Sequence, residues 1–359
     1  MLRKEGGAVV VVEAPGIVTP AKRPLVEGGE SAQRESRARW RLQLANLGIL
    51  PAIVVLLIIG TSINREFLSV TNLLNILSGS SYLAFLAVAE ALVIIAGQFD
   101  LSLEGTIAFT PMLGAWLASA HAPGSGLGLG LAFGTMITLG AGAAIGLVNG
   151  ILVVSLGISS FLVTLAMQIA LAGLSYGLTS GLTINEPSGP LVWLGEAQIG
   201  RVPVSVIASV ALVVLVTVLL RYTRTGRQLY AIGGNREAAR RNGIRTKRIW
   251  FGLFIVSGLL GSLAGMIISG QTAAVIPDQG AGITLTIFAA VAIGGVSLNG
   301  GKGYLWGVGL GVLLLGTTTD LLTIAQVPPQ VIDTIEGAVV LAALVLNRFT
   351  GGRARESTA

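Results

Sequence analysis

Carboxylates stand where this sequence is otherwise strongly apolar. The segment AGQFDLSLEGT, residues 96–106, carries Asp100 and Glu104, and Glu90 interrupts the preceding run LAVAEALVII. Ionisable groups at membrane depth cost roughly 2.5 to 3.5 kcal/mol each, so they persist where they face protein, water or a transported solute. The chemistry open to Glu90 is a hydrogen bond at a helix contact, contact with a solute in a pathway, or proton relay.

Most catalytic and metal chemistry is excluded by composition. The chain has no cysteine, which removes disulfides, thiolate metal sites and cysteine catalysis. A single histidine, His121, permits no histidine-based constellation. We therefore expect no catalytic residue, no metal and no cofactor in this chain, and an intramembrane enzyme has no obvious site here.

The elements that must position these carboxylates are transmembrane helices. Of 359 residues, 53% are hydrophobic and 11% are charged, against roughly a quarter charged in soluble domains. We predict an all-α, polytopic transmembrane bundle with about ten spans over residues 46–347, flanked by a polar tail at 1–45 and a short tail at 348–359. The apolar runs are 46–63, 79–97, 105–121, 127–155, 158–178, 202–220, 249–270, 284–298, 303–322 and 329–347.

The basic residues predict the orientation of the chain in the membrane. They fall in residues 1–45 (eight), 221–248 (nine) and 348–355 (three), with single residues at Arg65, Arg201 and Lys302. The positive-inside bias places the three rich segments in the cytoplasm, with six spans before the central loop and four after it. Both termini are then cytoplasmic. Topology explains the net charge of +6, so we expect no nucleic-acid partner.

The segment around Asp100 reads as a break between two helices. Gly97 and Gly105 bracket it, and irregular backbone at membrane depth needs protein or water to satisfy its polar groups. One hypothesis is that Asp100 and Ser102 hold this break by hydrogen bonds and, with Glu90 and Gln98, line a pathway. The alternative is that Asp100 only caps the following helix.

Glycine recurs every four residues in the fourth apolar run. It occupies positions 126, 130, 134, 142, 146 and 150, with Thr138 at the missing step. On a helix this spacing makes a small-residue stripe that lets another helix approach closely. We predict helix packing through Gly130, Gly134, Gly142 and Gly146.

The basic loop at 221–248 predicts a short helix outside the bundle. Asn235 is a good N-cap, residues 236–242 favour helix, and Gly243 suits a left-handed stop. Ala238 and Ala239 would give this helix a low-relief face able to enter a groove, beside arginines such as Arg240. A basic segment resting on anionic lipid is the alternative.

Three ordered motifs carry a family resemblance. The first motif is residues 97–102, with Gly97, Asp100, Leu101 and Ser102. The second is residues 226–244, with Gly233, Gly234, Asn235, Glu237, Ala238, Ala239 and Gly243. The third is AVAIGGVSLNGGKG, residues 290–303. Together they resemble the permease subunits of bacterial ABC importers of the ribose-type monosaccharide family, related more distantly to branched-chain amino-acid permeases. Gln98, Glu104, Thr284 and Thr286 depart from the family pattern.

The resemblance implies a set of partners in the bacterial inner membrane. It implies a second permease copy, in a homodimer or heterodimer, a periplasmic substrate-binding protein and an ABC ATPase that carries ATP and Mg. The helix at residues 235–243 would dock on that ATPase, through Gly233, Gly234, Asn235, Glu237 and their neighbours. This chain lacks a GxxxxGK[ST] phosphate loop.

Two other transport functions stay open from the sequence. An ion-coupled secondary transporter of a small polar solute would use Glu90, Asp100 and broken helices. An ABC permease could also carry amino acids, nucleosides or a signalling molecule rather than a monosaccharide.

Overall fold

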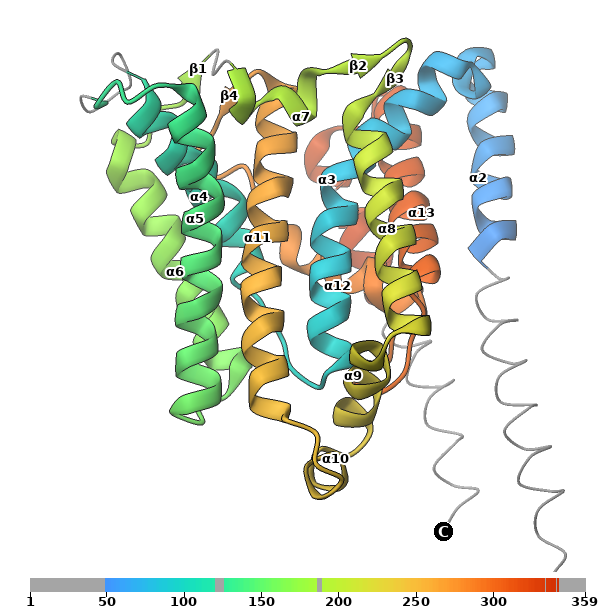
Figure 1. The fold of residues 1–359 in the computed structure, drawn as a ribbon. Helices are drawn as coiled ribbons and strands as arrows, with labels where there is room; N and C mark the ends of the chain where they lie inside the picture. Colours follow the sequence, from blue (N-terminus) through green and yellow to red (C-terminus); the bar gives the residue numbers. More distant parts are fainter. Residues whose placement is uncertain (1–48, 120–125, 186–188, 333, 340, 342–359) are drawn as a thin grey trace, which may run out of the picture. The chain divides into compact units, whose positions relative to one another are not determined.

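Helices, most of them long and apolar, make up most of the described structure (Figure 1). The computed structural model describes residues 49–119, 126–185, 189–332, 334–339 and 341, all within the compact unit Leu44–Ala359. The main helices are α2 (Ile49–Ile63), α3 (Val70–Ile95), α4 (Leu103–Ala118), α5 (Leu131–Gly150), α6 (Ser160–Thr179), α8 (Val204–Tyr222), α9 (Arg224–Gly234), α10 (Arg236–Arg241), α11 (Thr246–Thr272), α12 (Ile283–Ile293) and α13 (Leu305–Ile324).

The short elements connect these helices. They are η1 (Arg65–Leu68), the π-helix η2 (Ile151–Ser155) that extends α5, η3 (Gly189–Leu191), α7 (Trp193–Glu196), and the strands β1 (Ile184–Asn185), β2 (Gln198–Ile199), β3 (Val202–Pro203) and β4 (Ala274–Val275). Strand β1 pairs antiparallel with β4, and β2 with β3. Both pairs lie at the end of the bundle opposite α9 and α10 (Figure 1).

Six helices of the described residues are long and apolar enough to cross a membrane. They are Val70–Ile95, Ala132–Ser155, Ser160–Thr179, Val204–Tyr222, Thr246–Thr272 and Leu305–Ile324. The shorter helices α2, α4 and α12 overlap the first, third and eighth apolar runs of the sequence. Much of the tenth run, 329–347, lies outside the described residues, as does His121. The all-α membrane architecture is confirmed, and the number of ten spans stays a prediction.

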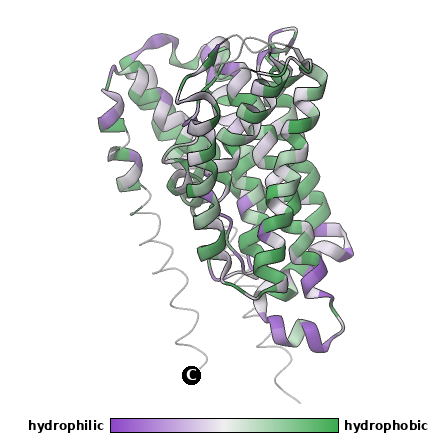
Figure 2. Cartoon of the chain, turned by 90° about the vertical axis from the view of Figure 1, so that its left-hand side faces the viewer, coloured by the Kyte–Doolittle hydropathy of each residue, from purple (hydrophilic) through white to green (hydrophobic). Residues whose placement is uncertain are grey.

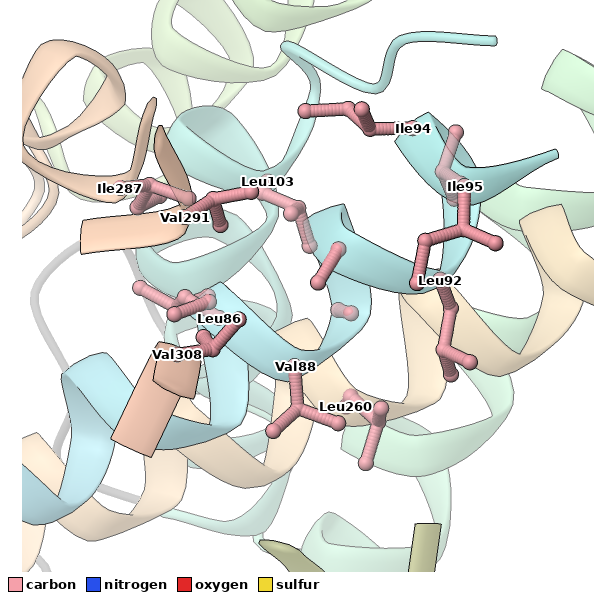
Figure 3. Close-up of a cluster of buried hydrophobic side chains, with 14 of the residues drawn as sticks. Leu86, Val88, Leu92, Ile94, Ile95, Leu103, Leu260, Ile287, Val291 and Val308 are labelled. Atoms are coloured by element: carbon pink, nitrogen blue, oxygen red, sulfur yellow. The ribbon is translucent and has the colours of Figure 1, made fainter. Parts of the chain in front are cut away.

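Helix α3 is the centre of the bundle. It begins at Ser69, whose hydroxyl accepts the N–H of Asn72 at 3.2 Å, and it packs against α8, α11, α12 and α13. Its most apolar stretch is 83% buried, which is the highest share of the six candidate spans. Leu86, Val88 and Leu92 belong to a cluster that also takes in Leu260 of α11 (Figure 3). Every residue from Leu83 to Ile95 is buried, so this part of α3 is a core element.

Hydrophilic residues gather on α9 and α10 outside the apolar bundle (Figure 2). The helices of the bundle consist mainly of hydrophobic residues (Figure 2), and many large ones are exposed, as expected where the surrounding medium is lipid. Helix α9 was not predicted from the sequence. Thr223 caps it by accepting the N–H of Gly226 at 3.1 Å, and Leu229 and Ile232 anchor it to the core.

Glycines on α5 place it in backbone contact with two helices. Gly134 lies against Gly114 of α4, where an added Cβ would be 2.7 Å from the Gly114 oxygen. Gly142 lies against the backbone of Gly258 in α11. Such contacts replace the missing hydrophobic drive between helices in lipid.

The predicted stripe was wrong at its first two positions. Gly126 and Gly130 precede α5, which begins at Leu131. Gly130 has a φ of 90°, and nothing lies within 4 Å of a Cβ added there. Gly130 therefore turns the chain into the helix rather than packing against a neighbour, a conformation that glycine adopts without steric cost.

We predict that Gly146→Ala destabilises the bundle. An added Cβ at Gly146 would overlap the carbonyl oxygen of Phe254 in α11, so α5 and α11 must separate. Overpacking of this kind costs roughly 1 to 3 kcal/mol. The measurement is thermal unfolding of the purified chain in detergent. The matched control is Gly140→Ala on the same helix, where nothing lies within 4 Å. Equal melting temperatures for the two variants would contradict the packing role.

Candidate functional site

Three segments far apart in the sequence meet at the end of α3. The N–H of Gly301 donates to the carbonyl oxygen of Ile95 at 2.9 Å. A Cβ added at Gly300 would lie 3.1 Å from the Cα of Gly97 and 3.2 Å from the oxygen of Gly233. A Cβ added at Gly233 would overlap the Ile95 oxygen. We call Ile95, Gly97, Gly233, Gly300 and Gly301 the glycine junction. Its backbones touch with no side chain between them.

Two aromatic side chains form hydrogen bonds to backbone carbonyl groups next to the junction. The hydroxyl of Tyr230 in α9 donates to the carbonyl oxygen of Gly303 at 2.8 Å. The indole N–H of Trp250 in α11 donates to the carbonyl oxygen of Ala96 at 3.1 Å. Burial raises the pKa of Tyr230 to about 12, with a smaller contribution from Tyr304. Tyr230 is therefore a neutral hydrogen-bond donor at any physiological pH.

Helix α10 is capped at both ends as the sequence predicted. The side chain of Asn235 accepts the N–H of Ala238 at 2.9 Å, and Gly243 has a φ of 78°. Glu237 pairs with Arg240 and Arg241 at 3.2 Å each. Hydrogen bonds from these arginines lower the pKa of Glu237. The pairing thus stabilises α10 at pH values above the usual carboxyl pKa. This stabilisation is lost as the pH falls through the lowered pKa of Glu237.

The predicted alanine face of α10 is only partly correct. Ala238 is exposed, whereas Ala239 is 4% exposed and packs into the main core of this same chain. Gly233 is likewise enclosed by the glycine junction. The two alanines point in different directions because neighbouring helical positions do not share a face. Of the residues predicted to dock, those that are exposed are Gly234, Asn235, Glu237, Ala238, Arg240 and Gly243.

A side-chain contact between Arg236 and Trp250 also joins α10 to α11. The guanidinium of Arg236 lies 4.3 Å from the ring centroid of Trp250, a distance that permits a cation–π contact. Since Trp250 in turn bonds to Ala96, one chain of contacts links α10, α11 and the end of α3.

The predicted break between α3 and α4 is present at residues 96–102, and side chains satisfy its backbone; its predicted far end at Gly105 was wrong, because Gly105 lies within α4. Gly97, with a φ of 77°, ends α3. The N–H of Asp100 then donates to the carboxylate of Glu90, at 3.2 Å to one oxygen. The N–H of Leu101 donates to the hydroxyl of Thr164 at 3.0 Å. Irregular backbone buried in an apolar bundle requires such partners.

The carboxylates of Glu90 and Asp100 are buried and accept hydrogen bonds from the backbone of the break. Glu90 is 1% exposed and Asp100 is 2% exposed. Asp100 accepts the N–H of Ser102 at 3.1 Å and also its hydroxyl, and the amide of Asn149 donates to that hydroxyl at 2.8 Å. No Lys or Arg among the described residues forms an ion pair with Glu90 or Asp100.

The start of α4 involves Asp100 in both hypotheses about this residue. Ser102 stands directly before α4 and makes no side-chain cap bond of its own, whereas Asp100 accepts the N–H of Ser102. A capping role for Asp100 therefore stays a prediction. The hydrogen-bonding role of Asp100 and Ser102 is confirmed. Gln98 is partly buried, and its N–H closes the end of α3 by donating to the Val93 oxygen at 3.0 Å. A place for these residues in a transport pathway stays a prediction.

Glu104, an unexplained departure from the family pattern, caps a different helix. Its two carboxylate oxygens accept the N–H groups of Gly282 and Thr284, each at 3.1 Å. Both N–H groups lie at the start of α12. A carboxylate at a helix N-terminus is favoured by the free donors and by the helix dipole. Glu104 therefore joins α4 to α12.

A polar cavity of about 580 Å³ lies between α3, α12, α13 and residues 336–337. Its polar lining comprises Asn75, Ser80, Tyr82, Gln279, Thr286, Thr319, Asp320, Thr323 and Glu336. None of the four pathway residues proposed from the sequence lines it. The cavity draws on the first part of α3, whereas the glycine junction lies at the last residue of the same helix.

The sequence contained a signal for this cavity. Thr317, Thr318, Thr319 and Asp320 form a polar cluster within an otherwise apolar run. Whether they line a cavity depends on which of them face α3 and α12. Helix periodicity alone does not distinguish a face packed in the interior from a face that lines a cavity. Thr319 and Asp320 line the cavity, while Thr317 is 3% exposed and bonds to its own helix.

Comparison with known proteins agrees with this architecture. Residues 72–344 match the family described as branched-chain amino acid transport system / permease component. The ribose import permease protein of Escherichia coli (strain K12) is 31% identical over 321 residues, covering 88% of this chain and 97% of that protein. The ribose import permease protein of Bacillus subtilis (strain 168) is 33% identical over 310 residues, covering 85% and 93%.

A third relative differs in its named sugar. The L-arabinose ABC transporter permease protein of Azospirillum brasilense is 29% identical over 329 residues, covering 91% of this chain and 95% of that protein. No solved structure matches the chain.

Six long apolar helices around a buried helix break and a polar cavity are the architecture of a multi-pass membrane protein. The chain belongs to the branched-chain amino acid transport system / permease component family. It is a permease component and not an enzyme.

We predict that Gly233→Ala opens the glycine junction. The new methyl group would overlap the Ile95 oxygen and approach the N–H of Gly301. We expect α9 and α10 to detach from α3, so trypsin should cut the arginine-rich segment 224–248 several-fold faster in detergent solution. The matched control is Gly234→Ala, where nothing lies within 4 Å of the added carbon. Identical digestion of both variants and the wild type would show that the junction does not hold this segment.

We predict that Asp100→Ala destabilises the helix break. It removes the acceptor of two donors on Ser102, both buried. An unsatisfied buried donor costs roughly 1 to 3 kcal/mol. Asp100→Asn keeps an acceptor oxygen and should lose less. The free energy of unfolding, measured with denaturant in mixed micelles, separates the three proteins. Asp100→Ala as stable as the wild type would refute the structural role.

Proposed function

We propose that this chain is the membrane-spanning permease subunit of an ATP-driven (ABC) importer for a monosaccharide or a similar small polar solute. Support comes from its family and from relatives named for ribose and L-arabinose import. The solute would be delivered by a periplasmic binding protein. The observation that carries the proposal is α10, a capped helix outside the bundle that the glycine junction fixes to the end of α3.

Helix α10 is proposed as the coupling helix that docks on the ATPase. Its exposed surface offers Asn235, Glu237, Ala238 and Arg240, which combine a small apolar contact with charged groups. Ala239 and Gly233 face inward, so they transmit motion rather than touch the partner. ATP and Mg would bind on that partner, since this sequence has no GxxxxGK[ST] loop.

The proposed orientation places α9 and α10 in the cytoplasm of a bacterium, with the chain in the inner membrane. Lys302 follows the glycine junction at this end, while Arg65 starts η1 and Arg201 lies between β2 and β3 at the other end. This distribution follows the positive-inside bias. Ten spans and two cytoplasmic termini complete the proposal, although residues 1–45 and 348–359 lie outside the described residues.

Two permease copies are proposed to form the complete pathway, as either a homodimer or a heterodimer. Many large apolar side chains of α2, α5, α6 and α8 are exposed in the single chain, including Ile58, Met136, Ile169 and Val214. Lipid and a second copy would both cover such surfaces.

Coupling in this proposal is mechanical. Nucleotide binding on the ATPase would favour one of two bundle arrangements by contacting α10 differently in each. A helix joined to the core backbone to backbone has no flexible side chain to absorb displacement. Motion of α10 would therefore reach α3 directly through Gly233 and through the Arg236–Trp250–Ala96 contacts.

The proposal is tested by reconstitution with the ATPase and the binding protein. Ala238→Trp adds bulk to the exposed surface of α10, and we expect ATP-driven sugar uptake to fall at least about ten-fold, equivalent to about 1.4 kcal/mol of coupling. The matched control is Thr225→Trp, which places the same bulk at an exposed position of α9.

Two outcomes would overturn the proposal. One is uptake by Ala238→Trp equal to that of the wild type. The other is uptake by the chain alone, driven by an ion gradient and independent of the ATPase, which would make it a secondary carrier using its buried carboxylates.

A further inference from the structure

The cavity between α3, α12 and α13 has the size and position of a cargo site. Its volume of about 580 Å³ falls in the range of roughly 300 to 1,000 Å³ typical of small-molecule pockets. Asn75 and Gly79 of α3, Leu285 of α12 and Thr323 of α13 are all exposed lining residues, so the cavity opens at the surface of the chain. The cavity is therefore open and large enough for a solute of monosaccharide size.

Two carboxylates dominate the chemistry of this cavity. Glu336 accepts the hydroxyl of Thr319 at 2.6 Å and that of Thr286 at 3.5 Å. Asp320 accepts the side-chain amide of Asn72 at 2.9 Å on one oxygen. Each carboxylate has about four acceptor positions, so both retain capacity for further donors. These donors would be hydroxyl or ammonium groups of a solute.

The rest of the lining suits a solute with polar edges and apolar faces. Amide and hydroxyl groups come from Asn75, Gln279 and Thr323, and the ring of Tyr82 lies among them. Aliphatic wall is supplied by residues such as Leu83 and Leu315. A small number of placed polar groups in an apolar wall fixes the orientation of a ligand.

The charge of the lining is of one sign. No Lys, Arg or His of the described residues lines the cavity, and neither Asp320 nor Glu336 takes part in an ion pair within the described part of the chain. A cleft lined by one sign of charge between low-dielectric walls focuses its field, which raises the local concentration of opposite charges and lowers that of like charges. Negative side chains select in the same way in cation-conducting pores.

We propose that this cavity is where the cargo touches the permease, that it takes uncharged polyhydroxylated or positively charged solutes, and that Asp320 and Glu336 exclude anionic sugars such as sugar phosphates and sugar acids. The role of the cavity as a cargo site rests on the proposed import function. Its charge selectivity does not depend on that function.

The first experiment measures charge selectivity in the full-length chain. Because the sequence has no cysteine, Asn75→Cys introduces a single thiol in the cavity lining. Its reaction rates with trimethylammonium-ethyl and sulfonatoethyl methanethiosulfonate are compared with those of a free thiol. We expect the cationic reagent to be favoured, and neutralisation by Asp320→Asn or Glu336→Gln to reduce the preference several-fold for each carboxylate.

Glu66→Gln is the matched control for this measurement. Glu66 lies in η1, directly before α3 at the same end of the bundle, but it does not line the cavity. We expect this variant to keep the full preference. Equal normalised rates for the two reagents at Asn75→Cys, or an effect of Glu66→Gln as large as that of Glu336→Gln, would overturn the assignment.

The second experiment separates the cavity from the importer proposal. In the reconstituted complex, Asn75→Cys is modified with neutral benzyl methanethiosulfonate, which fills part of the cavity. We expect sugar uptake to fall at least five-fold while ATP hydrolysis continues, and Thr225→Cys on α9 to tolerate the same reagent. Uptake that survives modification refutes the cargo site and leaves the importer intact. An unmodified complex that imports no sugar with ATP refutes the importer, whatever the reagent ratio.

Discussion

The structure depends on backbone-to-backbone contact at the end of α3. Gly97, Gly233 and Gly300 come from three distant segments, and a Cβ on Gly233 would overlap the carbonyl oxygen of Ile95. Lipid gives helices little hydrophobic reason to associate, so close approach of backbones must supply dispersion contacts and hydrogen bonds in its place. The bond from the Gly301 N–H to the Ile95 oxygen is one such contact. Because glycine alone fits, three motifs that look unrelated along the chain are parts of one contact.

The second constraint on the structure is that the buried backbone N–H groups next to this junction need hydrogen-bond acceptors. The irregular segment between α3 and α4 is buried at Asp100, Leu101 and Ser102, whose backbone N–H groups have no helical partner and no water to bond. Glu90 and Thr164 accept two of them, and Asp100 accepts another from Ser102. Glu104 does the same for the start of α12. The acidic residues that stood out in the sequence are thus explained by unsatisfied N–H groups, without any need for catalysis.

Much of the architecture could be predicted from the sequence, because apolar length and helix caps are local signals. Asn235 and Gly243 bound α10 as expected, and Gly97 ends α3. What sequence could not supply was the facing of side chains in three dimensions. Ala239 looked available for a partner yet packs on its own chain, and Gly130 matched a helical spacing but lies before the helix. The cavity escaped prediction because its lining is assembled from α3, α12, α13 and residues 336–337, which only the fold brings together.

Helix α3 connects the features that matter for transport. Asn75 lines the cavity, Glu90 holds the helix break and Ile95 belongs to the glycine junction. Twenty helical residues separate the first from the last, a rise of roughly 30 Å at 1.5 Å per residue. Helix α3 has no proline along this length, and every residue from Leu83 to Ile95 is buried, so in the proposed importer a displacement at the junction would be passed along the helix towards the cavity wall. In the proposed importer, α3 would therefore connect the end that receives force from the ATPase with the end that the solute meets.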